Sequence, residues 1–359
     1  MRDSILVIGG YGHVGKQISR ELARLYPGKV LAAGRSLDKA EAFSRESNGS
    51  VLPMEIDIRV EPDHDMLARI KLVVMCLDQQ DTAFVHSCLS QGIHYVDVSA
   101  DYRFLSQVEL LCSTAQSNRA TAVLSVGLVP GLSNLMALRT KRLLDVAEEI
   151  NISVMLGLGD SHGKAAIEWT IDQMNCDFGV LERGEPVKAF SFREGRKTDF
   201  GNGLGKRTAY RFNFADQHIL PRTLQVPTVS TRLCFDSALA TRMVSALKAM
   251  GALRILNLKQ VRDFAVNRFA SFKAGEPIFA VKVDAIGKKQ KESTLAECFL
   301  YGLREAEATA KTAAVIAKAL YASDHPHGVF HIEELFEFAA FEEALTGTAE
   351  MSERLVKLP

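Results

Sequence analysis

The sequence predicts an α/β protein, in which a Rossmann-type doubly wound parallel sheet is followed by an α+β domain built on a mixed, largely antiparallel sheet. Two observations support the first domain. Apolar strand-like segments alternate with amphipathic helical segments over about the first 125 residues, and a glycine cluster follows the first strand. After about residue 147 the strand candidates become longer and alternate between apolar and polar side chains, which is typical of antiparallel sheets.

The first domain has six predicted strands, which are SILVIGG, KVLAAG, VLPMEID, KLVVMCL, HYVDVS and TAVLSVG. Helices are predicted between them at about residues 16–25, 82–91 and 105–118. Continuous apolar strands separated by helices form parallel sheets that are covered on both faces. Such sheets bind ligands at the carboxyl ends of their strands.

The second domain has five predicted strands, which are EINISVMLGLG, VKAFSFRE, RTAYRFNF, STRLCF and PIFAVKVDAIG. Its predicted helices cover about residues 165–181, 237–250 and 258–269. From Ser293 an Ala-rich pattern predicts a return to helix, with a last helix over about residues 332–345. We expect a Rossmann domain over 1–135, a substrate-binding and dimerisation domain over 136–305, and C-terminal helices over 306–359.

The composition argues against several classes of protein. Basic and acidic residues both number 43 and no basic block stands out, which disfavours nucleic acid or an anionic membrane as a partner. No apolar run reaches the length of about 18 residues that a membrane span needs. The six cysteines never form C-x-x-C, and the nine histidines show no ligand-like pairing. We therefore expect a soluble cytoplasmic homodimer that binds no metal.

The glycine cluster has the pattern G-x-G-x-x-G and lies between the first strand and the first helix. In this context Gly10 would permit the tight turn, Gly12 would let backbone N–H groups approach a diphosphate, and Gly15 would let the helix pack closely. A purely structural turn is the alternative. The predicted dinucleotide-binding loop comprises Gly10, Tyr11, Gly12, His13, Val14 and Gly15.

The end of the second strand favours NADP over NAD. NAD sites usually carry Asp or Glu at this point, which accepts hydrogen bonds from the ribose hydroxyls. This chain has Gly34 there, followed by Arg35 and Ser36. A guanidinium and a hydroxyl suit a 2′-phosphate, which a carboxylate would repel. The alternative for Arg35 is an ordinary solvated surface charge.

The nicotinamide half of the cofactor is expected beyond the fourth, fifth and sixth strands. The stretch GLVPGLSN predicts a Pro-Gly loop that enters a helix capped by Ser133 or Asn134, where an anion could bind. An ordinary connection between two elements explains the same residues. The further candidates for cofactor contact are Asp57, Cys76, Leu77, Ser99, Gly127 and Pro130.

Proton transfer has four candidate residues. Asp97 and Asp101 lie in YVDVSADY, where a carboxylate can orient a substrate amine or accept its proton. His162 and Lys164 lie in GLGDSHGKAAIEW, on a predicted loop that enters a helix. Histidine titrates near neutral pH, and lysine can pair with a carboxylate. Each of the four is also explained as a positioning or solvated residue. Arginines that could anchor substrate carboxylates, or simply be exposed charges, are Arg193, Arg196 and Arg207.

The motifs GGYGHVG, GRSLDKA, GIHYVDVSADY and GLVPGLSNLMA occur in this order, and with them the chain resembles the saccharopine dehydrogenase-like family, named for its NADP-binding domain. Two later stretches, FADQHILPRTLQVPTVSTRLCFDS and HGVFHIEEL, are similar to that family's second domain and C-terminal helices. The resemblance implies that the α+β domain is inserted into the Rossmann domain, to which the C-terminal helices return. It also implies oxidation or reduction at a carbon–nitrogen bond of an amino-acid-derived compound.

We therefore expect an NADP-dependent oxidoreductase that interconverts an amine and an imine, or forms a secondary amine reductively, on a carboxylate-bearing small molecule. NAD is the less favoured cofactor. A non-catalytic NADP-binding regulator or redox sensor is the alternative, because its glycine loop would look the same. A short-chain reductase is disfavoured, since the chain contains no Tyr-x-x-x-Lys pair.

Overall fold

The computed structural model describes residues 2–60, 62, 64–201, 203–271 and 275–358. The chain divides into two compact units. Unit 1 comprises Met1–Gly131 and Thr309–Ala344, and unit 2 comprises Leu132–Ala308 and Leu345–Pro359. Unit 1 is therefore interrupted in the sequence by most of unit 2.

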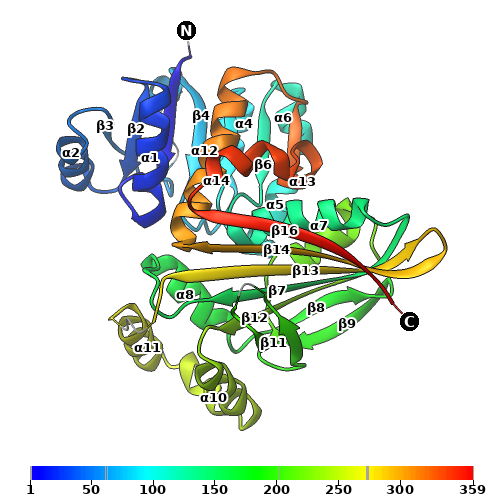
Figure 1. Cartoon of the computed structure of the whole chain (residues 1–359). Helices are drawn as coiled ribbons and strands as arrows, with labels where there is room; N and C mark the ends of the chain where they lie inside the picture. Colours follow the sequence, from blue (N-terminus) through cyan, green and yellow to red (C-terminus); the bar gives the residue numbers. More distant parts are fainter. Residues whose placement is uncertain (1, 61, 63, 202, 272–274, 359) are drawn as a thin grey trace. The chain divides into compact units, whose positions relative to one another are not determined.

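Unit 1 contains a seven-stranded sheet, here called sheet A, in which all paired strands are parallel (Figure 1). Its order is β15-β6-β5-β4-β1-β2-β3, which contains the strand order of dinucleotide-binding Rossmann folds. The six expected strands are present, so the predicted parallel sheet is confirmed. The strands are β1 Ser4–Ile8, β2 Val30–Gly34, β3 Leu52–Glu55, β4 Ile70–Met75, β5 His94–Asp97, β6 Thr121–Leu124 and β15 Gly328–His331.

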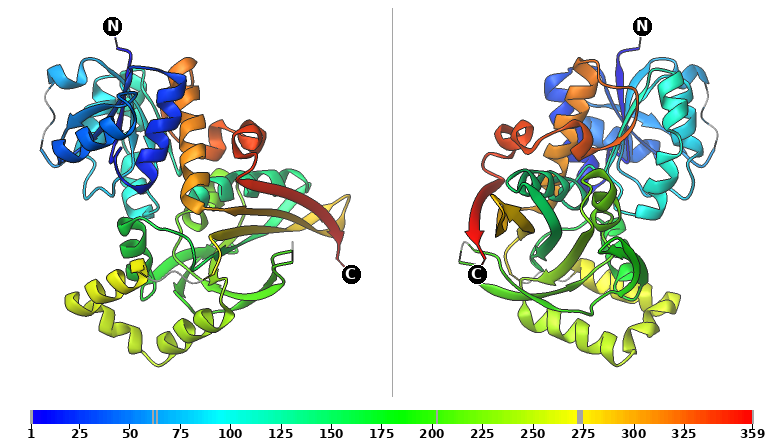
Figure 2. Two further views of the ribbon diagram at one scale, coloured as in Figure 1. Left: turned by 60° about the vertical axis from the view of Figure 1, so that its left-hand side comes forward. Right: turned by 90° about the vertical axis from the view of Figure 1, so that its right-hand side faces the viewer.

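Helices cover both faces of sheet A, which explains why its central strands are apolar throughout. Ile5–Ile8 of β1 are fully buried. On one face α1 and α12 lie side by side (Figure 2), and the rings of Tyr26 and Tyr321 at their ends are 4.3 Å apart. The helices are α1 His13–Leu25, α2 Leu37–Glu46, α3 His64–Leu67, α4 Ala83–Ser90, α5 Tyr102–Glu109, α6 Cys112–Ser117, α12 Glu305–Ala322, α13 Ile332–Leu335, the 3₁₀ turn Phe338–Phe341 and α14 Glu342–Leu345.

Unit 2 is built on a second seven-stranded sheet, sheet B, with the order β10-β11-β12-β7-β13-β14-β16. Its pairs are antiparallel except for β12 with β7, which confirms the mixed, largely antiparallel sheet. A separate hairpin is formed by β8 and β9. The strands are β7 Val146–Leu156, β8 Asp177–Glu182, β9 Glu185–Phe190, β10 Arg196–Asp199, β11 Lys206–Arg211, β12 Thr228–Phe235, β13 Ile278–Lys289, β14 Glu292–Leu303 and β16 Ala349–Lys357.

Among the residues that the structure describes, five helices and one 3₁₀ segment lie wholly within unit 2. One of them, α7, packs against β7, β13 and β14, and α9 packs against β12. The helices are α7 Ser133–Arg142, α8 Lys164–Gln173, α9 Asp216–Thr223, α10 Ala238–Ala249 and α11 Lys259–Ser271, with the 3₁₀ segment Ala252–Asn257 between the last two. Among the described residues, no helix has both the length and the apolarity needed to span a membrane.

Two predicted helical stretches are strands in the structure. Residues 292–303, expected to begin a long helix at Ser293, form β14, and the helix α12 begins only at Glu305. The burial pattern of β14 has a period of two, because Ala296, Cys298 and Leu300 face inward. Because the residues that follow are rich in Ala, the predicted helix was extended over this strand as well. Likewise α8 ends at Gln173, and 177–182 form β8 rather than the end of a helix.

Candidate cofactor and active site

The glycine loop is closely packed between β1, β2 and α1. Gly9 takes the left-handed conformation, with φ of 73°. A Cβ atom on Gly10 would lie 2.7 Å from Cα of Ala32 in β2, and one on Gly15 would lie 2.1 Å from the carbonyl oxygen of Gly9. The turn predicted for Gly10 therefore depends on Gly9, and Gly10 is needed because the loop lies against β2. Gly15 allows close packing of α1, as expected.

The first turn of α1 is suited to a diphosphate. Its N-cap residue is Gly12, no side chain caps it, and the first turn contains no acidic residue. Gly12 and His13 are exposed, and a Cβ atom on Gly12 would contact only the Gly9 carbonyl oxygen within 4 Å. The backbone N–H groups at the start of a helix lack intrahelical partners and carry partial positive charge. The loop thus offers an open, uncapped site for an anion.

Tyr11 connects the glycine loop to the end of β2. Its hydroxyl oxygen accepts a hydrogen bond from the backbone N–H of Ser36, at 3.1 Å. A Cβ atom on Gly34 would lie 2.4 Å from the same oxygen. The position where NAD-binding proteins usually carry an acid must therefore be glycine as long as Tyr11 occupies this place. The Ser36 side chain in turn caps α2 by accepting a hydrogen bond from the Lys39 N–H.

Arginine side chains surround the carboxylate that follows β3. Arg59, which the sequence analysis did not single out, donates to Asp57 through Nε at 2.9 Å and through its backbone N–H at 3.1 Å. These hydrogen bonds, with the charges of Arg59 and Arg35, lower the pKa of Asp57 to about 2. Arg35 is exposed and forms no ion pair at 4 Å or closer within the described part of the chain. Asp57 is thus influenced by two guanidiniums, and the exposed Glu55 lies opposite Gly34 in the sheet.

The residues expected near the nicotinamide lie at the carboxyl ends of β4, β5 and β6. The Cys76 N–H donates to the Ile8 carbonyl oxygen at 3.0 Å, and the Leu77 side chain contacts Gly9. Gly127 and Pro130 are both buried, in a loop where the Leu128 N–H donates to the Thr309 hydroxyl at 3.1 Å. These backbone positions place the loops after β4 and β6 at the same edge of sheet A.

Asp97 is completely buried at the end of β5. Its carboxylate accepts hydrogen bonds from the Tyr95 hydroxyl at 2.7 Å, the Ser99 N–H at 2.7 Å and the Gln79 amide at 3.3 Å. Burial nevertheless raises the pKa of Asp97 above its ordinary value. Both oxygens are thus engaged in holding the loop after β5, to which Ser99 belongs.

Asp101 is the N-cap of α5. Its carboxylate accepts hydrogen bonds from the Arg103 N–H at 2.9 Å and from the Arg103 guanidinium at 3.1 Å. It is partly exposed, with 31% of its side chain accessible. The two aspartates of YVDVSADY therefore have separate hydrogen-bond partners.

A buried chain of polar side chains joins β6 to β15 in unit 1. The Ser125 hydroxyl lies 2.8 Å from His331 Nδ1, and His331 Nε2 lies 2.8 Å from the Glu109 carboxylate. Ser125 and His331 are at most 1% exposed, and Ser125 is left-handed, with φ of 59°. This order of groups resembles a nucleophilic triad, but the serine has no exposed surface. This contact was not predicted from the sequence, because 206 residues separate Ser125 from His331.

His162 lies in unit 2 beside two carboxylates. Its Nδ1 is 3.3 Å from the Glu305 carboxylate, and Asp160 accepts a hydrogen bond from the Glu305 N–H at 2.8 Å. Burial lowers the pKa of His162, but the hydrogen bond and charge of Glu305, with Asp160, more than offset it, so the pKa is raised overall. Lys164 points elsewhere: 74% of its side chain is exposed, and it pairs with Glu168 at 3.6 Å.

The helix after GLVPGLSN begins differently from the prediction. The N-cap of α7 is Leu132, with no side-chain cap, so neither Ser133 nor Asn134 caps it. Both residues are buried, and the Ser133 hydroxyl donates to the Asp216 carboxylate at 3.2 Å. Because a carboxylate of the chain itself lies at this helix start, a substrate anion would meet repulsion there.

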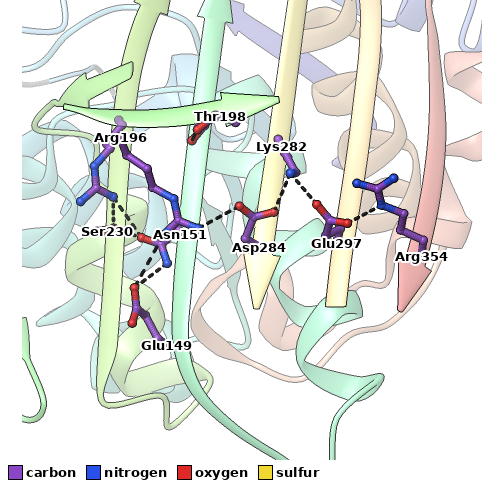
Figure 3. A network of polar contacts seen from close by, with 11 residues as sticks. Glu149, Asn151, Arg196, Thr198, Ser230, Lys282, Asp284, Glu297 and Arg354 are labelled. Carbon is purple, nitrogen blue, oxygen red and sulfur yellow. Dashed lines mark hydrogen bonds and ion pairs between the residues drawn. The ribbon is translucent and has the colours of Figure 1, made fainter. Parts of the chain in front are cut away.

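One face of sheet B carries a polar network, buried at its centre and exposed at Arg354, that was not predicted from the sequence (Figure 3). Its central row crosses five strands in register and consists of Ser230, Asn151, Asp284, Glu297 and Arg354. Asn151, Asp284 and Glu297 each lie between two apolar residues that face the other side of the sheet. Single acidic or basic residues within apolar runs were the only sequence signal for this row.

Lys282 lies at the centre of the network. Its Nζ is 3.1 Å from the Asp284 carboxylate and 2.5 Å from the Glu297 carboxylate, and all three side chains are at most 7% exposed. Arg196 of β10, which lies across this face in Figure 3, contacts Asp284 at 3.1 Å. Burial raises the pKa of Asp284, whereas Arg354 and Lys282 outweigh burial at Glu297 and lower its pKa. Arg196, a candidate anchor for a substrate carboxylate, is thus occupied by acids of the chain.

Two sets of the predicted site residues lie together in the structure. Tyr11, Gly34 and Ser36 meet at the end of β2, and Asp97 and Ser99 meet after β5. His162 and Lys164 each pair with a different glutamate of unit 2. Arg207 donates to the backbone oxygens of Lys206 and Asp236, at 3.1 and 3.4 Å.

Comparison with known proteins supports the cofactor site. The family model described as Saccharopine dehydrogenase NADP binding domain matches residues 5–123. No curated protein matches the chain in sequence. The match covers the glycine loop and the ends of β2 to β5, so NADP as the cofactor is confirmed and an oxidoreductase is supported.

A solved structure has the same fold. Apo histidine-tagged saccharopine dehydrogenase (L-Glu forming) from Saccharomyces cerevisiae is 12% identical, covers 99% of this chain and 100% of its own, and has a TM-score of 0.71. At this identity the similarity shows the fold alone. DAP dehydrogenase of C. glutamicum in complex with DAP is 12% identical over 96% of this chain and 99% of its own, with a TM-score of 0.47.

Proposed function

We propose that the protein is an NADP-dependent oxidoreductase, on the basis of the match of residues 5–123 to the saccharopine dehydrogenase NADP-binding domain model. Its substrate is an amino-acid-derived small molecule with a carboxylate, and it acts on a carbon–nitrogen bond. The observation that carries this proposal is the family match over an uncapped glycine loop, followed by arginine at the end of β2. The cofactor supplies or accepts the hydride, and the protein positions the reactants.

We assign the diphosphate to the N–H groups of the glycine loop and of the first turn of α1. The 2′-phosphate is assigned to Arg35, Arg59 and the backbone near Ser36, since guanidiniums bind phosphate through paired N–H groups. The remaining contacts proposed for the cofactor are Tyr11, Gly34, Asp57, Cys76, Leu77, Ser99, Gly127 and Pro130.

His162 is the proposed group that exchanges a proton with the substrate nitrogen. Among the four candidates it alone combines a pKa raised from near 6.5 with a partly accessible ring, 13% of which is exposed. A general acid or base is most effective when its pKa lies near the working pH. Asp97 is proposed to hold the loop after β5, and Asp101 and Lys164 to bind or orient the substrate.

The test is NADPH consumption with a panel of oxo acids combined with amino acids or diamines, followed by the absorbance of the reduced nicotinamide. We expect turnover with at least one combination. The substitution His162→Asn should lower kcat by about 100-fold or more, whereas Lys318→Gln, on the exposed surface of α12, should not change it.

Two results would contradict this proposal. Tight NADPH binding without consumption across the panel would favour the alternative, a non-catalytic NADP-binding regulator or redox sensor. Failure to bind either NADPH or NADH would remove the cofactor assignment itself. A homodimer located in the cytoplasm remains part of the proposal, and sedimentation velocity of the purified protein measures the assembly.

A further inference from the structure

The helix α10 presents an apolar stripe to solvent. Leu239, Met243 and Met250 are 70%, 55% and 72% exposed. Their spacing places all three on one side of the helix, opposite Thr241 and Ser245, which bond to the rest of unit 2. In Figures 1 and 2 this helix lies on the outside of unit 2. A solvent-facing stripe of large apolar residues on a surface helix marks an interaction site.

The apolar surface continues beyond the helix, where Ile255 and Leu258 are 55% and 60% exposed. The same part of the chain is purely basic. Residues 237–262 contain five Lys or Arg and no Asp or Glu. Within the described chain Arg242 and Arg254 form no ion pair with a carboxylate, and both are exposed. The other three basic residues pair with aspartates, so the local positive charge of this segment comes from Arg242 and Arg254.

A cationic cavity of about 190 Å³ opens on the flank of the stripe. Four of its seven lining residues are basic, and none of these four forms an ion pair with a carboxylate among the residues that the structure describes. The nearby acid Asp236 accepts hydrogen bonds from the N–H groups of Leu158 and Ser237. The lining residues are Lys197, Lys206, Arg207, Thr208, Ala238, Thr241 and Arg242.

We propose that this surface, the stripe of α10 with Ile255, Leu258 and the adjoining cationic cavity, docks the protein on an anionic phospholipid surface. A second copy of the chain fits less well, because the arginines and the basic cavity of this surface would face the same positive charges on that copy. A membrane surface matches both features of this face. The region where its acyl chains begin can bury the Leu and Met side chains, and its phosphates can pair with the arginines and the basic residues of the cavity. The proposal is independent of the oxidoreductase activity.

The test is co-sedimentation of the full chain with phosphatidylcholine vesicles and with vesicles that also contain phosphatidylserine. We expect binding to the anionic vesicles only, weakened by added NaCl. Removing two cations with Arg242→Gln and Arg254→Gln should lower partitioning by about fivefold for each charge. The triple variant Leu239→Ser, Met243→Ser, Met250→Ser should lower it at least as much.

Matched controls are Leu110→Ser, at a leucine that is 80% exposed in unit 1, and Lys318→Gln. Both should leave partitioning unchanged, and far-UV circular dichroism with urea unfolding reports folding of every variant. The proposal is overturned by equal binding to neutral vesicles or by no binding at low salt. It is also overturned if the triple variant only converts a dimer to a monomer, if an acidic protein alone binds the stripe, or if only inorganic phosphate binds the cavity.

Discussion

At the scale of single residues, Tyr11 and Gly34 link the glycine loop to the preference for the cofactor. The tyrosine hydroxyl occupies the space in which any side chain at position 34 would begin. An acid that accepts ribose hydroxyl hydrogen bonds cannot be accommodated there without moving Tyr11. Tyr11 and Gly34, which lie 23 positions apart, thus together prevent the acidic residue that NAD-binding proteins usually carry at this position.

The first prediction concerns Arg35. Replacing it with alanine removes a charge-assisted contact to the 2′-phosphate but leaves every contact available to NAD. We expect Arg35→Ala to weaken NADPH binding by about tenfold or more and to leave NADH binding within about twofold. Fluorescence titrations with both nucleotides measure this. Equal weakening of NADPH and NADH would contradict the assignment, and Arg119→Ala, at an exposed arginine in the same unit, is the control.

The second prediction separates the capping role of Asp101 from a catalytic one. Loss of the N-cap in Asp101→Ala should lower the free energy of unfolding by about 1 kcal/mol, while Asp101→Asn should retain most of the cap. If Asp101 acts only as a cap, Asp101→Asn keeps full turnover. If turnover falls while stability is unchanged, the carboxylate itself is required, as the proposed function states. Urea unfolding and steady-state kinetics are measured on the same samples.

At the scale of elements, one face of sheet B combines a charged network with an apolar cluster that includes Met155, Cys234 and Ala280. Lys282 is buried between Asp284 and Glu297, and its removal would leave two buried carboxylates with Arg196 and Arg354 as their remaining partners. The loss of a buried ion-pair partner is costly because the remaining charge stays desolvated.

The third prediction follows for Lys282→Met. We expect it to lower the free energy of unfolding by about 3 kcal/mol, the lower end of the range for buried pairs, since each carboxylate keeps one arginine. The control is Lys288→Met on the same strand, where the side chain is 57% exposed. That change should cost less than about 0.5 kcal/mol. Equal effects of the two substitutions in urea unfolding would show that the network adds nothing to stability.

The fourth prediction concerns the pH dependence of the loop that contains His162. The folded state raises the pKa of His162 above its ordinary value of 6.5, so folding favours the protonated ring. The resulting stability is fully present below about pH 6.5 and is lost as the pH rises through the folded pKa. Glu305→Gln should therefore destabilise the protein more at about pH 5.5 than at about pH 9. A pH-independent effect in urea unfolding would refute this.

The elements also show where pattern reasoning fails. Six of the seven strands of sheet A were predictable, because most of them are continuous apolar runs between helices, whereas β15 lies where C-terminal helices were expected. Strand β14 was not, because Ala, Leu and Glu favour helix locally and its alternation is weak. Pairing with β13 over twelve residues overrides that preference. The exposed edge strand β16 carries almost no burial pattern, so nothing in its sequence indicated its place beside β14.

At the scale of the whole molecule, the glycine loop, Arg35 and the fold class could be predicted because they depend on residues near each other in sequence. The charged row of sheet B and the Ser125–His331–Glu109 chain could not, since each joins residues from distant strands. The same limit applied to Arg59, whose importance depends on the nearness of β2 and β3.

The fifth prediction concerns the response of the two units to cofactor. NADPH at about 100 times its Kd should stabilise the unit that binds it by about 2.7 kcal/mol. Hydrogen exchange of intact protein should slow in peptides from β1, α1 and β2, and much less in peptides from β13 and β14. Uniform slowing in both units would contradict assignment of the cofactor to unit 1 alone.

The place of β15 in sheet A has a consequence for how the polypeptide is made. This strand pairs with β6, although the 177 residues of Leu132–Ala308 are translated between the two parts of unit 1. At ordinary elongation rates the ribosome needs roughly 10 to 35 s for that interval. Throughout it, β6 is an open edge on the nascent chain. We therefore expect newly synthesised protein to need protection of that edge until residue 331 has emerged.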